Sequence, residues 1–282
     1  MSTPPATGRI TDHYAAGARL DAVLNAVRAA IPPGRACDIS DLAPLDQFHA
    51  GGAEATDELA RLAGVRAGMR VLDVGCGIGG PARHLAARFA CQVTGLDLAA
   101  EYCRIAEALT TLVGLDGRAA FQAGDACNLR FPAGGFDLVW TQHAAMNIAD
   151  RPRLYAEMHR VLAPGGVVAI YDAVAGDGDA PLFPTPWADR PEDSFLLAPA
   201  AMRTLLEAAG FEITVWQDAT EAARGWFARR RPAAPAAPSA PPPALGLHLL
   251  LGPDTARMVG NFARNVLEGR VGLHMAVARK PG

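Results

Sequence analysis

The sequence predicts an α/β fold: a doubly wound, Rossmann-like sheet with helical cap elements outside it. From residue 69 to residue 174, short apolar runs of strand length alternate with longer segments of helical periodicity. Such alternation is typical of a parallel sheet built from β-α-β units. The first run leads into a glycine-rich turn and then a helix, which is the arrangement of a ligand-binding turn in these folds.

Five strands are expected in this alternating part. The run at 167–174 is almost entirely apolar, as expected for a strand that is covered on both faces. The expected strands are 69–74, 93–98, 119–123, 136–141 and 167–174, and the expected helices between them are 80–89, 101–112 and 151–162.

The flanking segments predict the cap. Apolar positions at helical spacing predict a helix over 10–31, followed by a loop over 37–52 and a helix over 56–62. Beyond 174, the expected elements are a Gly/Pro/Asp-rich loop at 176–198, a helix at 199–209, a strand at 211–216, a helix at 221–231, a mostly helical segment at 245–268 and a last strand at 271–278. We therefore divide the chain into an N-terminal helical lid (1–55), a core (56–220), a cap insertion (221–268) with a Pro-rich linker (232–243), and a final core strand (269–282).

Composition excludes several classes of function. The 282 residues contain 26 Lys and Arg against 29 Asp and Glu, which argues against a nucleic-acid binder. No apolar run approaches the ~20 residues that span a bilayer, so no membrane partner is expected. The first residues show no signal peptide, which favours a cytoplasmic protein. The cysteines are scattered without a CxxC pair, so neither a zinc site nor a disulfide framework is expected; they are Cys37, Cys76, Cys91, Cys103 and Cys127.

The strongest motif is the turn after the first strand, VLDVGCGIGG at 71–80. Gly75, Gly77 and Gly79 let the backbone turn tightly and let a ligand approach, and the following helix presents free N–H groups. The same residues also admit a dinucleotide reading, because Gly75, Gly77 and Gly80 satisfy G-x-G-x-x-G with Asp97 about 20 residues further on. Asp73, just before the glycines, favours another ligand, because a carboxylate there repels a pyrophosphate but suits the ammonium of a methionine moiety.

Further motifs follow the next strands in an order that suits S-adenosylmethionine (SAM). GLDL at 95–98 places Asp97 where it can accept hydrogen bonds from both ribose hydroxyls. Asp125, in GDA at 124–126, follows the third strand and can read the adenine amino group. FDLVW at 136–140 and LAPGG at 162–166 complete the set.

With these motifs the chain resembles the class I SAM-dependent methyltransferases, and within them the sarcosine/dimethylglycine N-methyltransferase-like small-molecule enzymes. The finer resemblance rests on WTQH at 140–143, NIAD at 147–150 and LEGR at 267–270, and more weakly on FHAGG at 48–52. It implies a seven-stranded sheet whose last strand is antiparallel. It also implies that the methionine part is held by Asp73, Gly75 and Gly77, the ribose by Asp97 and Leu98, and the adenine by Asp125 and Ala126. Gly79 and Gln142 are further candidates for cofactor contact. Many relatives carry His-x-Pro-Asp where this chain has NIAD, so no role for that histidine can be transferred.

Candidate residues for chemistry come from the loops around the motifs. His143 follows the fourth strand and can act as a general base near neutral pH, or only terminate the strand through hydrogen bonds. His49 can line the mouth of the pocket, and Tyr14 can cover the cofactor. Asn147 and the aromatic residues Phe183 and Trp187 are candidates for substrate binding.

The sequence thus predicts a SAM-dependent methyltransferase that acts on a small molecule by in-line displacement and needs no metal. By resemblance the acceptor is an amine nitrogen; sulfur, oxygen and carbon acceptors remain open, as does the need for a general base. The alternatives are an NAD-dependent oxidoreductase, a non-catalytic SAM-binding module, and a methyltransferase of protein or nucleic acid. Against nucleic acid, TQHA at 141–144 stands where base-methylating enzymes carry an Asx-Pro-Pro-aromatic motif.

Overall fold

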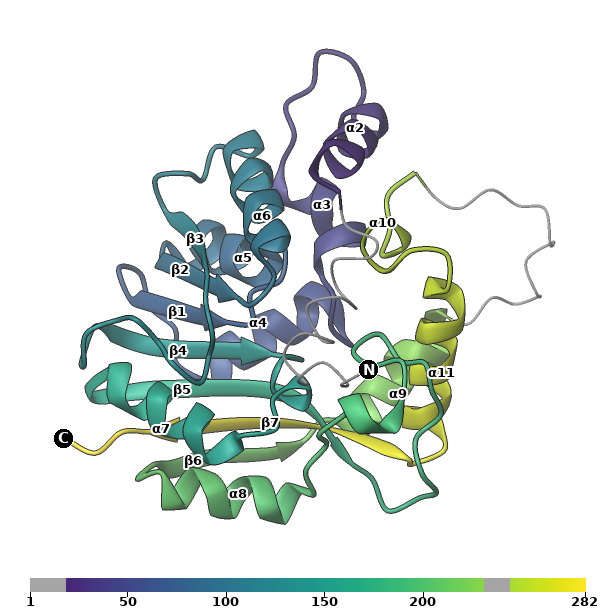
Figure 1. Cartoon of the computed structure of the whole chain (residues 1–282). Helices are drawn as coiled ribbons and strands as arrows, with labels where there is room; N and C mark the ends of the chain where they lie inside the picture. Colours follow the sequence, from purple (N-terminus) through teal and green to yellow (C-terminus); the bar gives the residue numbers. More distant parts are fainter. Residues whose placement is uncertain (1–18, 231–243) are drawn as a thin grey trace, which may run out of the picture.

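The computed structural model describes residues 19–230 and 244–282. The expected linker at 232–243, Tyr14 and the first part of the expected N-terminal helix lie outside these residues. At the centre is a seven-stranded sheet (Figure 1) whose strands, in spatial order, are β3 (Ala119–Ala123), β2 (Gln92–Asp97), β1 (Arg70–Val74), β4 (Phe136–Gln142), β5 (Leu162–Ala175), β7 (Val271–Arg279) and β6 (Glu212–Asp218).

The pairing confirms the predicted fold class. β1 to β5 pair with their neighbours in parallel, whereas β7 lies antiparallel between β5 and β6. The chain runs outward from β1 through β2 to β3 and then returns to place β4 on the other side of β1. This reversal makes the β1–β4 boundary the topological switch point, where open α/β sheets bind their ligands.

Helices cover both faces of the sheet because its strands are apolar on both sides. Leu138 packs into one hydrophobic cluster and its neighbour Val139 into the other, as the two-residue period of a strand requires. The first cluster receives residues from α4 (Gly52–Leu62), α5 (Gly80–Phe89), α9 (Thr220–Arg230) and α11 (Thr255–Leu267). The second receives residues from α7 (Arg151–Val161) and α8 (Pro199–Ala208).

A third cluster forms outside the sheet and builds part of the cap. It joins α6 (Ala100–Leu112) to α2 (Leu20–Ala30), α3 (Ile39–Asp46) and the short α10 (His248–Leu251). A buried ion pair ties α3 to the core, because Arg83 on α5 donates to Asp46 Oδ2 at 2.8 Å and the two side chains are only 1% and 2% exposed. In Figure 1, α3, α9 and α11 gather near the carboxyl ends of the parallel strands.

Two expected elements differ in detail. The predicted loop at 37–52 contains α3, because Asp38 and Asp41 form a reciprocal capping box that satisfies the first N–H groups of the helix. The predicted turn at 162–166 belongs to β5, which starts at Leu162 and pairs with β4 from there.

Membrane-spanning helices and metal-binding clusters are both absent from the described residues. None of the helices at 19–230 and 244–282 is both long and apolar enough to cross a bilayer. In the same ranges, no group of three or more His, Cys, Asp and Glu side chains is placed to hold a metal ion.

Candidate active site

The glycine-rich turn joins β1 to α5 at the switch point. Gly75 and Gly77 have positive φ angles of 75° and 55°, a conformation that side chains disfavour. A Cβ on Gly75 would lie 2.2 Å from the Cβ of Ala144, so the turn and the loop after β4 touch. A Cβ on Gly77 would meet no atom within 4 Å, because this glycine faces a cavity.

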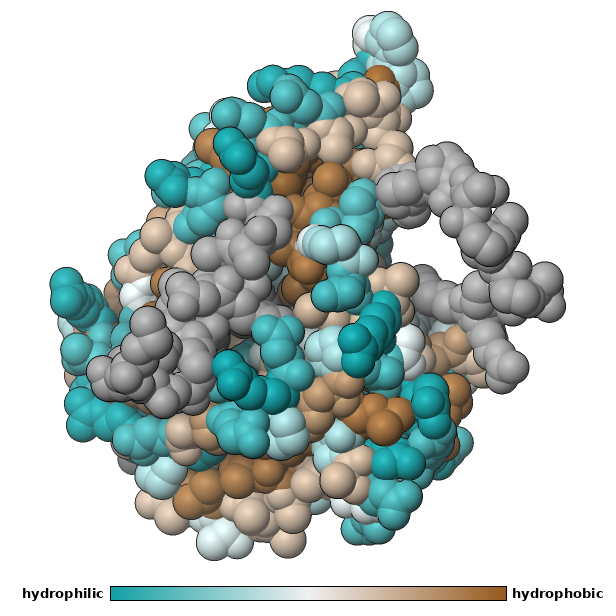
Figure 2. All heavy atoms as spheres, turned by 45° about the vertical axis from the view of Figure 1, so that its right-hand side comes forward, coloured by the Kyte–Doolittle hydropathy of each residue, from teal (hydrophilic) through white to brown (hydrophobic). Residues whose placement is uncertain are grey.

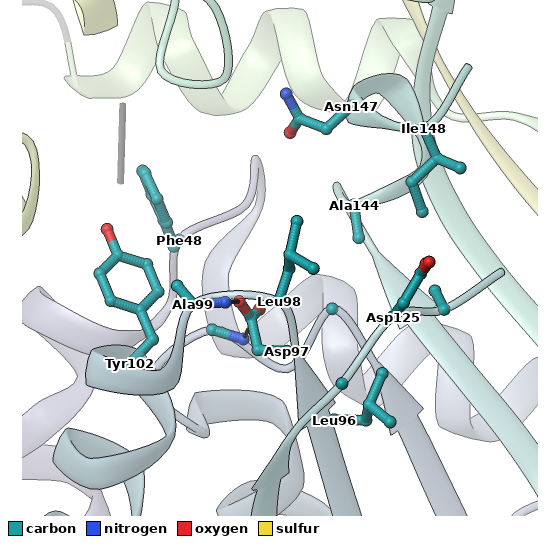
Figure 3. Close-up of a pocket in the computed structure, with 14 residues that line it drawn as sticks. Phe48, Leu96, Asp97, Leu98, Ala99, Tyr102, Asp125, Ala144, Asn147 and Ile148 are labelled. Atoms are coloured by element: carbon teal, nitrogen blue, oxygen red, sulfur yellow. Dashed lines mark hydrogen bonds between the residues drawn. The ribbon is translucent and has the colours of Figure 1, made fainter. Parts of the chain in front are cut away.

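That cavity, the cofactor cavity hereafter, encloses about 780 Å³, part of it open to solvent. Figure 3 shows Phe48 and Tyr102 on one side, Ala144, Asn147 and Ile148 on the other, and Asp97 and Leu98 between them. The complete lining is Phe48, Gly75, Gly77, Leu96, Asp97, Leu98, Ala99, Tyr102, Gly124, Asp125, Ala126, Ala144, Asn147 and Ile148.

Two carboxyl groups make this cavity suitable for a cation. Asp97 Oδ2 accepts from the Gly77 N–H and Oδ1 from the Ala99 N–H, both at 2.9 Å, so the acid is fixed at the end of β2. Asp73 is 1% exposed, and its Oδ2 has no hydrogen-bond partner in the described part of the chain. Burial, and then the charge of Asp97, raise the pKa of Asp73 to about 8. A positive ligand would favour the charged form of Asp73, whereas a pyrophosphate would be repelled.

The residues present therefore fit SAM. The partly buried carboxylate of Asp97 still has free lone pairs for ribose hydroxyls. Asp125 and Ala126 line the cavity next to Gly124, which suits the adenine end. The open space at Gly77 suits the methionine end, where the field of Asp73 acts.

A second cavity, the aromatic chamber hereafter, encloses about 500 Å³ and is partly open. The ring of Phe262 meets that of Trp187 edge to face at 5.1 Å and that of Phe227 at 5.3 Å. The lining residues are Gln47, Phe48, His49, Ala50, His143, Met146, Pro186, Trp187, Trp226, Phe227, Leu247, Val259 and Phe262. Figure 2, which brings the carboxyl ends of the parallel strands toward the viewer, shows hydrophobic atoms in a hollow of this face.

His143 is the most unusual residue of the chamber. Its φ of 50° is one of two positive values among the described non-glycine residues, and such strain concentrates at functional sites. Its ring lies 4.9 Å from that of Tyr171, and its Nε2 is buried without a hydrogen-bond partner in the described ranges. Burial, and then the nearby His49, hold the pKa of His143 well below its ordinary value. His143 is therefore neutral at physiological pH.

The loop after β4 separates the two cavities. His143 and Met146 line the aromatic chamber, whereas Ala144 and Asn147 line the cofactor cavity. Phe48 lines both. The two cavities are therefore neighbours that share Phe48 and the residues of one loop.

The predicted site residues fall into two groups. Gly75, Gly77, Asp97, Leu98, Asp125 and Ala126 line the cofactor cavity, and His143, His49 and Trp187 line the aromatic chamber. His49 is already hydrogen-bonded, because its Nε2 lies 2.9 Å from Gly52 O and 3.1 Å from Thr56 Oγ1.

Other predicted residues lie elsewhere. Asp73 sits behind the glycine turn and lines neither cavity. Gln142 is buried, where its Oε1 accepts from Trp140 Nε1 and Thr56 Oγ1 and so ties β4 to α4. Gly79 is the N-cap residue of α5, Phe183 packs against the core, and Asn147 lines the cofactor cavity and donates to Trp187 O at 2.6 Å. Tyr14 lies outside the described residues.

The residues that sequence reasoning missed are mostly apolar. Phe48 was noted only as a neighbour of His49, and Tyr102 only as part of a helix. Phe227 and Phe262 carried no motif, although both lie in segments assigned to the cap. The helical period of 245–268 was the one available signal for Phe262, since it predicts an apolar face that must be covered.

Comparison with known proteins identifies the core domain. Residues 72–170 match the methyltransferase domain family. Methyltransferase GfsG of Streptomyces halstedii is 35% identical over 48% of this chain and 48% of its own length. Ajmaline N-methyltransferase of Rauvolfia serpentina is 35% identical over 45% of this chain and 42% of its own. Sterol 24-C-methyltransferase of Eremothecium gossypii is 39% identical over 41% of this chain and 31% of its own length. The chain thus spans about half, or less, of the length of these curated relatives.

Solved structures share the fold over a longer stretch. The [4+2]-cyclase SpnF is similar with a TM-score of 0.65 at 24% identity, covering 100% of this chain and 98% of that one. A second similar structure is phosphoethanolamine N-methyltransferase 2 of Haemonchus contortus in complex with S-adenosylhomocysteine (SAH). Its TM-score is 0.68 at 22% identity, and the match covers 84% of this chain and 55% of that one. At these identities the likeness concerns the fold alone.

Proposed function

We propose that this protein, which carries a class I SAM-dependent methyltransferase domain, transfers the methyl group of SAM to a small molecule held in the aromatic chamber. The domain assignment rests on the match over 72–170. That match also argues against the dinucleotide reading of the glycine motif.

The observation that carries the proposal is the shared wall of the two cavities. Gly75 contacts Ala144, and the residues His143 and Met146 of the same loop line the chamber. In-line displacement requires the acceptor atom, the methyl carbon and the sulfur to be collinear, and holding reactants in such a geometry can lower a barrier by roughly 7–11 kcal/mol. Two adjacent cavities that share Phe48 can hold the two reactants next to each other, so the transfer needs no covalent intermediate.

The chain's own residues then have distinct tasks. Asp73 and Asp97 favour a cation in the cofactor cavity, and Phe48 limits the access of water between the cavities. When bound, SAM supplies the methyl group of its sulfonium, and transfer of that methyl group leaves the sulfur as a neutral thioether. A neutral amine becomes an ammonium as its new bond to carbon forms, so it takes over the positive charge of the sulfonium. An O–H acceptor becomes strongly acidic in that step, and His143 Nε2 takes its proton, so the charges balance in both cases.

The acceptor atom, the cap, the partners and the location of the protein are inferred as follows. We favour an amine nitrogen as the acceptor atom, because aromatic faces stabilise a developing ammonium. The curated relatives include enzymes named for nitrogen and for carbon transfer, so the choice of nitrogen rests on the chamber itself. We also propose that 1–55 and 221–268 act as the cap over the acceptor, that nucleic acid is not a partner, and that the protein is cytoplasmic.

Thermal unfolding with SAH, NAD⁺ or NADP⁺ tests the cofactor. We expect SAH alone to raise the Tm of the full chain. Asp97→Ala should abolish this rise, and Asp116→Ala, an exposed control, should preserve it. A response to a nicotinamide nucleotide with no response to SAH would overturn the proposal. With SAH binding established, release of SAH from SAM in the presence of small amines and phenols, and a product heavier by one methylene, measure the transfer itself.

A further inference from the structure

We propose that the acceptor is an uncharged, largely apolar molecule with one hydroxyl or amine group, and that a charged amino acid or a phosphorylated amine is excluded. This inference rests on the proposed function and concerns the same site. It departs from the sarcosine/dimethylglycine-type acceptor that the sequence resemblance suggests.

The walls of the chamber are largely apolar, and their apolar side chains come from separate segments of the chain. Trp187 lies in the loop after β5, Phe227 on α9, Phe262 on α11 and Met146 after β4. Trp187 is 2% exposed, and Phe227 and Phe262 are buried. Rings packed edge to face in this way form a rigid surface for a ligand of flat or branched hydrocarbon character.

The chamber also lacks a counter-charge. Among its lining residues, all of which belong to the described chain, there is no Asp, Glu, Lys or Arg. The only lysine of the sequence, Lys280, donates to the carbonyls of His159 and Leu162, at the opposite end of β5 from the loop that carries His143. A carboxylate or phosphate would therefore lose its hydration in the chamber without gaining a cationic partner, which is costly.

The polar atoms that line the chamber are neutral. Burial lowers the pKa of His49 to about 4, and the pKa of His143 is also far below its ordinary value. His49 Nε2 is engaged with Gly52 and Thr56, whereas His143 Nε2 is buried without a hydrogen-bond partner in the described chain. Gln47 adds one neutral acceptor, because its Oε1 is buried without a hydrogen-bond partner in the described chain. The set suits one polar group at the reacting end of a molecule that is otherwise apolar.

Calorimetry on the SAH-loaded full chain tests the inference with two matched probes. We expect 2-naphthol to bind at least about 100-fold more tightly than 6-hydroxy-2-naphthoate, since the two differ by one carboxylate that the chamber cannot pair. Dimethylglycine and phosphoethanolamine should give no heat of binding and no SAH release from SAM. Equal binding of the two naphthols, no binding of 2-naphthol, or turnover of either charged amine would overturn the inference.

A charge placed in the chamber provides a second test. Val259 lines the chamber and is half-buried, so Val259→Arg should tighten binding of 6-hydroxy-2-naphthoate at least about tenfold and weaken that of 2-naphthol. Val113→Arg, also half-buried, at the C-cap of α6 and outside both cavities, is the matched control and should change neither affinity. The SAH-induced Tm rise, recorded in parallel, separates the two failures. If SAH does not raise the Tm of the natural chain, the proposed function is contradicted. If SAH does raise it but Val259→Arg binds the two probes with the same relative affinity as the natural chain, only the inference is contradicted.

Discussion

Replacing Asp73 by asparagine tests the electrostatic basis of the cofactor cavity. Burial raises the pKa of this carboxyl from 3.8 to about 8. Between these values the folded protein keeps a proton that the unfolded chain releases, so stability falls as the pH rises from 4 to 8. At about 1.4 kcal/mol per unit, the penalty at pH 7 is up to about 4 kcal/mol. The neutral amide avoids this penalty, so unliganded Asp73→Asn should be more stable than the natural chain.

Denaturant unfolding between pH 5 and pH 8 measures this effect. The natural chain should lose up to about 1.4 kcal/mol of stability per pH unit from this group, and the variant should lack that part of the slope. Because the ammonium group that SAH shares with SAM favours ionised Asp73, SAH affinity of the natural chain should rise by up to about tenfold per pH unit below 8. In Asp73→Asn the affinity should be weaker and flat. Asp116→Asn, on the exposed surface, should leave both slopes unchanged.

Either of two results would refute the reasoning. The first is an identical pH slope of stability in the natural chain and in Asp73→Asn, which would mean that the carboxyl titrates normally when folded. The second is undiminished SAH affinity in the variant at pH 8, which would mean that Asp73 contributes nothing to the recognition of a cation.

Three further perturbations follow from the contacts. Gly75→Ala should abolish the SAH-induced Tm rise and cost about 1–3 kcal/mol of stability, because the new Cβ would meet the Cβ of Ala144 at 2.2 Å; Ala144→Gly in addition should restore part of the stability. Turnover at saturating SAM should be constant from pH 6.5 to 8 because His143 is already neutral, and His143→Gln should reduce kcat by about 10²–10⁴ without altering the SAH response. Arg83→Met leaves Asp46 buried without its cation and should cost about 3–5 kcal/mol in denaturant unfolding; a loss below 1 kcal/mol would contradict the role of this ion pair.

The sequence determined the features that depend on neighbours in the chain. The turn from Asp73 to Gly80 is readable because glycines at alternate positions permit a backbone that other residues resist. The continuous apolar run of β5 likewise predicts a strand covered on both faces, because this signal lies within the strand itself. The capping box of α3 was local too, but its aspartate at the fourth position is a weaker signal than glutamate, so the helix was missed.

The aromatic chamber was decided by tertiary structure. Phe48, Trp187, Phe227 and Phe262 are far apart in the sequence, and no period along the chain tells which helical faces will meet. The direction of His143 depends on its positive φ, which the contact of Gly75 with Ala144 and the hydrogen bond from His143 N–H to Tyr171 O hold in place. Composition reveals that the cap is rich in aromatic residues, but only the packing of the segments against one another places these residues around His143. Hydrophobic association is non-directional, so the tertiary packing decides which apolar faces meet.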